Sequence, residues 1–131
     1  AGQGLVTVDV ASAVAKDAAN NDNTAATQFS ITFDTLAPTL ILSSSTSSPT
    51  STSPIPVTAT FSEDVTGFVV GDITVGNGAA GNFVPVSGTV YTFDVTPAGQ
   101  GLVTVDVASA VAKDAANNDN TAATQFSITF N

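Results

Sequence analysis

The sequence contains a long internal repeat. Residues 1–33 recur without a single change as residues 98–130, an offset of 97 residues. Identity over this length indicates a recent duplication, or recombination within a long array. A 97-residue period is the size of a small domain and exceeds the roughly 20–50 residues of a solenoid repeat. Each unit is therefore expected to have its own core, and successive units to follow one another as separate domains.

The repeat also sets the expected domain boundaries. Residues 1–33 correspond to the C-terminal part of a preceding repeat, residues 34–38 to a linker and residues 39–131 to a complete repeat. The leading third is too short to be a complete domain, so we expect it to pack against upstream sequence or a neighbouring chain. The chain contains no Met and starts in mid-unit, so we expect it to be a segment of a longer protein.

Apolar and polar residues alternate through most of the unit. In one segment, Val103, Val105 and Val107 alternate with Thr104 and Asp106. A period of two in short segments rich in β-branched and aromatic residues predicts strands with one buried face. Seven segments have this pattern: Leu40–Leu42, Val57–Phe61, Ile73–Val75, Phe83–Val86, Tyr91–Val95, Val103–Val107 and Phe126–Phe130. Seven antiparallel strands in one unit predict an all-β Greek-key sandwich of the immunoglobulin type, arranged as a tandem array.

Two other segments differ in composition. Residues 108–116 (ASAVAKDAA) are rich in alanine and predict a short helical turn before the last strand. Ser43–Pro54 (SSSTSSPTSTSP) is a low-complexity tract. It is either O-glycosylated or a plain loop between the first two strands, and its shortness favours the plain loop.

The composition narrows the range of possible functions. The chain has no Cys, Trp or His, and its 11 acidic and two basic side chains give a net charge of −9. This charge argues against nucleic acids and anionic membranes as partners and favours divalent cations. The lack of Cys excludes disulfides and thiol chemistry. No segment approaches the roughly 18–20 apolar residues of a membrane-inserted helix. The abundance of small polar residues suits a secreted bacterial protein, extracellular or at the cell surface.

Most acidic residues of the unit lie in segments that this topology brings to one end. Because the strands alternate in direction, the linker, the loop after the second strand and the loop before the last strand should meet at the junction with the preceding unit. Six of the eight acidic residues in 34–130 lie in these segments: Asp34, Glu63, Asp64, Asp72, Asp114 and Asp119. Their carboxylates would repel one another strongly, because Lys113 is the only cation expected near them.

A bound Ca²⁺ ion would remove this repulsion. Calcium takes about six to eight oxygen ligands from Asp, Glu, Asn and backbone carbonyls, and the three segments supply these groups. Zinc and copper are not expected, because His and Cys are absent. The alternative is that Asp and Asn act only as turn formers, which would explain the run DAANNDN by itself. That run lacks the EF-hand spacing, but the convergence of three segments favours calcium at the junction.

Three runs of the unit resemble the bacterial Ig-like repeats of large surface proteins and adhesins. They are IPVTATFSEDVTGFVVGDITV (55–75), YTFDVTP (91–97) and DAANNDNTA (114–122). The linker DTLAP (34–38) is similar to the Asp-Thr-x-Ala-Pro junctions of those repeats. The resemblance covers the whole unit. It implies an immunoglobulin-like sandwich in tandem arrays, often with calcium rigidifying the junctions.

The resemblance also implies a set of metal ligands. The matching positions are Asp34, Glu63, Asp72, Asp114, Asn118 and Asn120. Asn117 and Asp119 stand where the family usually has Gly, which makes the loop stiffer and more acidic. Asn131 stands where the repeat would place the linker Asp, so that position loses one charge. With the acidic residues above, the candidate calcium ligands are Asp34, Glu63, Asp64, Asp72, Asp114, Asn118, Asp119 and Asn120.

The favoured function is structural: a repeat module of an extracellular bacterial stalk, adhesin or filament, with neighbouring repeats as partners and calcium at the junctions. A second possibility is a module that binds a glycan or protein, although the single Tyr, Tyr91, is expected to point inward. A third is self-assembly, in which residues 1–33 complete a sandwich in another subunit. An enzyme is not expected. The chain has no catalytic His or Cys, and the adjacent Glu63 and Asp64 would point to opposite faces.

Overall fold

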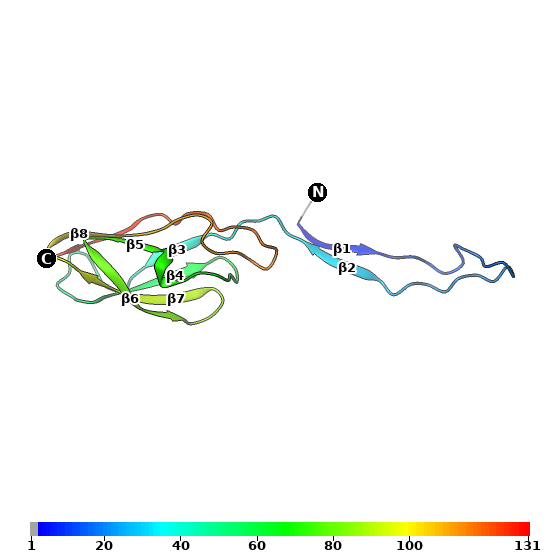
Figure 1. The fold of residues 1–131 in the computed structure, drawn as a ribbon, viewed down its shortest axis with the longest axis horizontal. Coiled ribbons are helices and arrows are strands. Elements are labelled where there is room, and N and C mark those ends of the chain that lie inside the picture. Colours follow the sequence, from blue (N-terminus) through cyan, green and yellow to red (C-terminus); the bar gives the residue numbers. More distant parts are fainter. Residues whose placement is uncertain (1–2) are drawn as a thin grey trace. The chain divides into compact units, whose positions relative to one another are not determined.

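The chain forms two compact units in the computed structural model, which describes residues 3–131 (Figure 1). The first unit ends at Leu36, and the second runs from Ala37 to Asn131. The first contains the hairpin of β1 (Gly4–Val8) and β2 (Phe29–Phe33), which pair in antiparallel fashion. The second contains β3 to β9 and one 3₁₀ turn, η1 (Val70–Asp72).

The second unit is a sandwich of two antiparallel sheets. One sheet has the strand order β3-β4-β7-β6 and the other the order β5-β8-β9. This is how the constant-type immunoglobulin fold divides its seven strands. The predicted all-β immunoglobulin-like class is therefore confirmed. The strand bounds are β3 Leu40–Ser43, β4 Ile55–Phe61, β5 Ile73–Gly76, β6 Gly78–Pro85, β7 Val90–Pro97, β8 Gly101–Val107 and β9 Phe126–Phe130.

The core lies between these two sheets because the apolar side chains alternate. In β4, Val57 and Ala59 are buried, whereas Pro56 and Thr60 face solvent. Each large apolar side chain removed from water stabilises the fold by about 1.5–3 kcal/mol before entropy is counted. The same alternation in β7 and β8 buries Tyr91, Phe93, Val95, Val103, Val105 and Val107.

An aromatic cluster fixes the loop that follows β4. The ring centroid of Phe68 lies 5.3 Å from that of Phe61 and 5.1 Å from that of Tyr91, both in edge-to-face geometry. The Tyr91 hydroxyl donates a hydrogen bond to the Val65 carbonyl at 3.2 Å. Since Glu63 lies two residues before Val65, this cluster positions an acidic part of the loop.

The predicted helical turn at residues 108–116 is wrong. This segment forms turns and an isolated bridge between Lys113 and Thr66, and Ala110 has a positive φ of 60°. The amides of Val111 and Ala112 donate to a side chain instead of to helix carbonyls. Alanine propensity is worth only tenths of a kcal/mol per residue, so these hydrogen bonds outweigh it. Within residues 3–131, no helix reaches the length and apolarity needed to cross a membrane.

The low-complexity tract connects β3 to β4. Within it, the Thr50 amide donates to the Thr129 carbonyl at 2.9 Å, and the Asn131 amide donates to the Thr50 carbonyl at 2.8 Å. These hydrogen bonds tie the connection to β9, which belongs to the other sheet. The tract therefore helps to close one side of the sandwich.

Candidate functional site

Two loops of the second unit meet at one end of the sandwich. Thr66, after β4, and Lys113, between β8 and β9, exchange backbone hydrogen bonds of 2.8 and 3.0 Å. As a result, a carboxylate oxygen of Glu63 lies within 4.8 Å of one of Asp114. The Thr121 amide also donates to the Pro38 carbonyl at 2.9 Å, so the segment before β3 adjoins the same loop.

Asp114 presents a fixed negative charge at this place. Its side chain is buried, and its Oδ1 accepts hydrogen bonds of 2.9 Å from the amides of Ala116 and Asn118. Its Oδ2 accepts another from the Asn118 side chain at 2.9 Å. The hydrogen bond from the Asn118 side chain, followed by backbone hydrogen bonds, lowers the pKa of Asp114 although burial opposes the shift. Asp114 is therefore ionised at neutral pH.

Asn120 holds the loop between β8 and β9 in shape. Its side chain is only 2 % exposed, and its Oδ1 accepts from the amides of Val111 and Ala112, both at 2.9 Å. Its Nδ2 donates to the carbonyls of Ala108 and Thr121 at 3.0 and 2.9 Å. Both lone pairs of the amide oxygen are in use, so a metal ion could bind Asn120 only if these hydrogen bonds were exchanged.

The remaining predicted ligands of this unit make other contacts. Asp119 forms an ion pair with Lys113, and both side chains are about half-exposed. The Asp72 carboxylate accepts from the Val69 amide at 2.9 Å, at the start of η1. Asp64 occupies the space where a Cβ on Gly88 would lie. Of the predicted acidic residues in residues 37–131, the structure thus brings Glu63 and Asp114 together and gives Asp64, Asp72 and Asp119 contacts elsewhere.

Asp34 lies in the first unit and shapes the linker. Its Oδ1 accepts from the Leu36 amide at 2.9 Å, an Asx-type turn. The neighbouring Thr35 amide donates to Oε1 of Gln3, also at 2.9 Å. The linker that leaves β2 is therefore organised by short-range hydrogen bonds.

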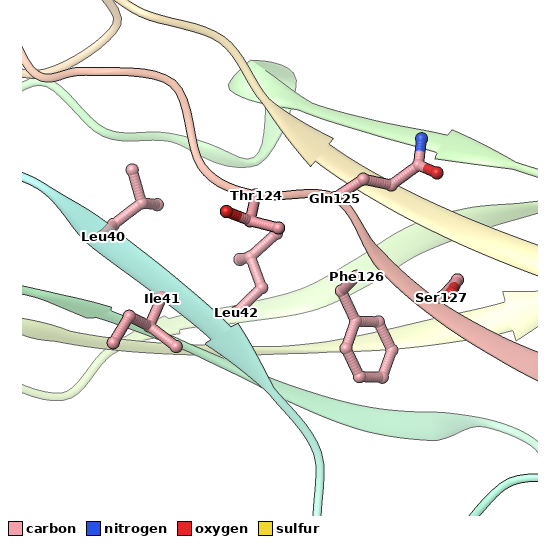
Figure 2. A pocket seen from close by; sticks show the side chains of 7 residues that line it. All are labelled: Leu40, Ile41, Leu42, Thr124, Gln125, Phe126 and Ser127. Carbon is pink, nitrogen blue, oxygen red and sulfur yellow. The ribbon is translucent and has the colours of Figure 1, made fainter.

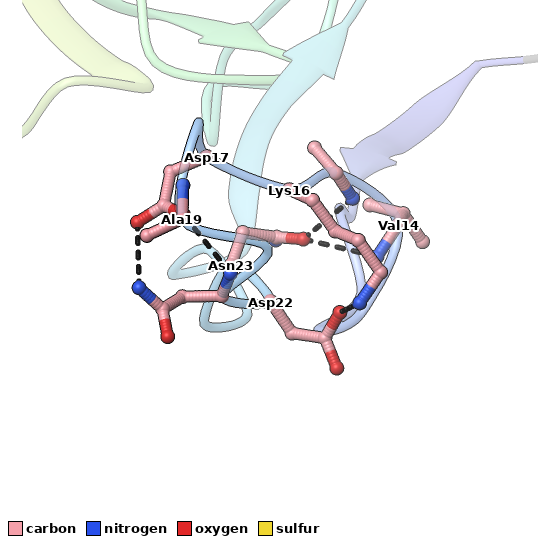
Figure 3. A network of polar contacts seen from close by, with 8 residues as sticks. Val14, Lys16, Asp17, Ala19, Asp22 and Asn23 are labelled. Atoms are coloured by element: carbon pink, nitrogen blue, oxygen red, sulfur yellow. Dashed lines mark hydrogen bonds and ion pairs between the residues drawn. The ribbon is translucent and has the colours of Figure 1, made fainter.

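The loop between β8 and β9 (residues 108–125), here called the acidic loop, has an identical copy at residues 11–28 of the first unit. Figure 3 shows polar contacts of this copy. Asn23 Oδ1 accepts from the amides of Val14 and Ala15 at 2.9 and 2.8 Å, as Asn120 does in the second unit. Asp17 accepts from Asn21, which lowers the pKa of Asp17. The difference is burial, because Asp17 is exposed whereas Asp114 is buried. Local sequence thus builds the loop, and the rest of the sandwich buries it.

A groove lies between β3 and β9, on a side where the two sheets part (Figure 2). Its volume is about 440 Å³. The lining consists of aliphatic, aromatic and small polar side chains: Leu40, Ile41, Leu42, Thr124, Gln125, Phe126 and Ser127. Since none of these groups is acidic or basic, the groove offers no pair of groups for proton transfer.

Two antiparallel sheets with this strand order define the second unit as an immunoglobulin-like domain. A family profile described as "Bacterial Ig-like domain" matches residues 34–130. The chain therefore belongs to this family of bacterial Ig-like domains, as its sequence motifs predict. Such domains are non-catalytic structural modules and typically occur in surface proteins. Comparison with curated proteins and with solved structures gave no match.

Proposed function

We propose that the chain is a structural repeat of an extracellular bacterial stalk, adhesin or filament, in which Ca²⁺ stiffens the junctions between units. The observation that carries this proposal is the unchanged recurrence of residues 1–33 as residues 98–130 around an immunoglobulin-like sandwich. Domains of this kind in series supply length. The seven residues of β4, at about 3.3 Å each, already span about 23 Å without the loops.

Glu63 and Asp114 are the centre of the proposed calcium site. Two oxygens bound to one Ca²⁺ at about 2.3–2.6 Å lie up to about 5 Å apart, and the 4.8 Å limit between these carboxylates fits this range. The lowered pKa keeps Asp114 charged, so a cation would offset its repulsion with Glu63. The Asn118 amide lies beside the same carboxylate and would add a neutral oxygen. Oxygen donors of this kind suit calcium.

Asp34 is the proposed ligand from the linker. It lies four residues before Pro38, and four extended residues span at most about 14 Å. Because the Pro38 carbonyl accepts from Thr121, the end of the linker is attached to the acidic loop. An ion held by Asp34 together with Glu63 and Asp114 would restrict the hinge between the units.

Calcium titration by calorimetry tests this proposal, and the repeat supplies a matched control. Asp114→Asn should weaken binding at least about tenfold, since one charged ligand is lost. Asp17→Asn makes the same change in the identical loop of the first unit and should leave the affinity unchanged. The proposal is wrong if the wild-type chain binds no Ca²⁺ up to about 10 mM, above the range of extracellular modules. It also fails if the two substitutions weaken binding equally.

A ligand-binding module is the alternative function. The chain has one Tyr and no Trp, and Tyr91 is buried with its hydroxyl bonded to Val65. These two residue types therefore form no platform on the surface described here. Binding of a glycan by the purified chain at micromolar concentration would favour this alternative over the structural one.

A further inference from the structure

The chain passes from one sheet of the sandwich to the other at Asn77, the single residue between β5 and β6. Its φ is 57°, in the left-handed region, which Asn adopts more readily than most side chains do. At the next residue, Gly78, a Cβ would lie only 2.7 Å from the carbonyl oxygen of Thr96. The turn therefore favours Asn or Gly followed by Gly, and Asn77–Gly78 is the only Asn-Gly dipeptide in the sequence.

Asn77 also ties this connection to the one between β7 and β8. The Ala98 amide donates to the Asn77 carbonyl at 2.9 Å, and the Asn77 Nδ2 donates to the Gly99 carbonyl, also at 2.9 Å. Because β7 and β8 belong to different sheets, this second connection also passes between the sheets. Two connections between the sheets are thus held together by the backbone and the side chain of Asn77.

The backbone nitrogen of Gly78 points away from β7. Opposite residues in an antiparallel pair of strands alternate between hydrogen-bonded and non-hydrogen-bonded pairs. Since Asn77 and Ala98 are hydrogen-bonded, the next pair, Gly78 and Pro97, is not, and Pro97 has no N–H to donate. β6 is the last strand of its sheet as far as residues 3–131 are concerned, so the ladder leaves the Gly78 nitrogen free.

We propose that Asn77 is a site of spontaneous modification, in which its side-chain amide is lost as ammonia and the link between the two connections weakens. Asn is among the thermolabile residues, and a following glycine has no side chain to hinder attack. The Gly78 nitrogen gives its proton to hydroxide and attacks Cγ of Asn77. The new N–Cγ bond closes a five-membered imide, the Cγ–Nδ2 bond breaks, and Nδ2 leaves as ammonia with a proton from water. Water then opens the imide at either carbonyl and gives aspartate or isoaspartate.

Both products weaken the link at Asn77. Aspartate places a carboxylate oxygen where Nδ2 donates, so the Gly99 carbonyl loses its hydrogen bond and faces a negative charge. Isoaspartate adds a methylene to the backbone between β5 and β6 and displaces the carbonyl that binds the Ala98 amide. The seven residues of β8, about 23 Å, separate this end of the sandwich from the acidic loop. The modification is therefore independent of the proposed calcium site.

Incubation of the purified chain in mildly alkaline buffer with chelator, followed by peptide mass spectrometry, tests this site. Asn82 is the internal control, because it also has a positive φ, 49°, and a hydrogen-bonded Nδ2, but is followed by the bulky Phe83. Asn82 is exposed and Asn77 is partly buried, so accessibility alone would favour Asn82. We expect Asn77 to convert at least about tenfold faster than Asn82, a barrier difference of about 1.4 kcal/mol.

The effect on the sandwich is measured in the same samples by thermal unfolding. The fluorescence of Tyr91 follows it, since Tyr91 is the only Tyr in a chain without Trp. The midpoint of the wild type should fall as Asn77 converts. Asn77→Gly is the matched control, because glycine adopts the same φ and has no side-chain amide. Its midpoint should stay constant through the same incubation.

Any of three results would overturn the proposal. The first is conversion of Asn77 no faster than that of Asn82. The second is a wild-type midpoint that stays constant although Asn77 has been converted. The third is a midpoint that falls equally in the wild type and in Asn77→Gly, since the loss would then arise elsewhere in the chain.

Discussion

Replacing Asn120 with Ala should destabilise the second unit strongly, although Asn120 lies in a loop. Its side chain is 2 % exposed and makes four hydrogen bonds to backbone groups. At about 0.5–1.5 kcal/mol each, four hydrogen bonds correspond to about 2–6 kcal/mol. Two of the four partner groups are the backbone carbonyls of Ala108 and Thr121, which are exposed residues. Water can therefore replace part of the lost hydrogen bonding. We therefore expect the free energy of unfolding to fall by about 2–4 kcal/mol.

Thermal unfolding followed by Tyr91 fluorescence measures this loss in the second unit alone, because Tyr91 is the only Tyr and Trp is absent. For a domain of this size, about 1 kcal/mol shifts Tm by about 4–8 °C, so Asn120→Ala should lower Tm by about 10–30 °C. Asn23→Ala removes the equivalent four hydrogen bonds from the first unit and should leave the Tyr91 transition unchanged. A shift below about 4 °C for Asn120→Ala, or equal shifts for both variants, would refute the role assigned to Asn120.

Three further predictions concern the core and the dependence of stability on pH. Phe93→Ala should cost about 3–5 kcal/mol in urea unfolding, whereas Phe29→Ala, at an exposed position, should leave the Tyr91 transition unchanged. The pKa of Asp114 is lowered, so its stabilising contribution is present above pH about 4 and is lost as pH falls through the folded-state pKa. In metal-free buffer, Asp114→Asn should therefore reduce the acid-induced fall in stability. Burial, followed by the charge of Asp64, raises the pKa of Tyr91. Its contribution is present below pH about 10 and is lost as pH rises through the folded-state pKa, and Tyr91→Phe should remove this alkaline loss.

Each of these predictions has a result that would contradict it. Equal urea midpoints for Phe93→Ala and the wild type would mean that the two sheets do not share the described core. The acid prediction is tested between pH 5 and pH 2, a range that brackets the ordinary carboxyl pKa of about 3.9. It would be contradicted if the stability of Asp114→Asn fell as steeply over this range as that of the wild type. Because Tyr91→Phe removes the fluorophore, its alkaline unfolding is followed by circular dichroism. If the stability of Tyr91→Phe fell as steeply above pH about 10 as that of the wild type, Tyr91 would not be the cause of the alkaline loss.

The strands could be predicted from sequence because their burial follows a simple rule. Alternation such as Val103, Val105 and Val107 allows one buried face in a strand and none in a helix. The alanine-rich residues 108–116 gave the wrong prediction because helix propensity is a weak local preference. Hydrogen bonds from Val111 and Ala112 to the distant Asn120 override it.

The candidate site was predictable only in outline. Strand directions imply that the loops after β4 and before β9 approach each other, and Thr66 and Lys113 do pair. Which carboxylates face one another depends on side-chain conformation, which alternation does not specify. The anchoring role of Asn120 was missed for a similar reason. The residue type indicates a turn, but its partners lie 8 to 12 residues earlier in the chain as well as next to it.

The most direct test of the account is whether Ca²⁺ restricts motion between the units. The chain has no Cys, so Thr7→Cys and Thr60→Cys, both at exposed positions, allow one spin label in each unit. Pulsed electron paramagnetic resonance then gives the distribution of distances between the labels. We predict a narrow distribution with Ca²⁺ and a broad one after chelation, and no narrowing by Ca²⁺ in a chain that also carries Glu63→Gln. Distributions of equal width with Ca²⁺ and with chelator would contradict the calcium-stiffened junction.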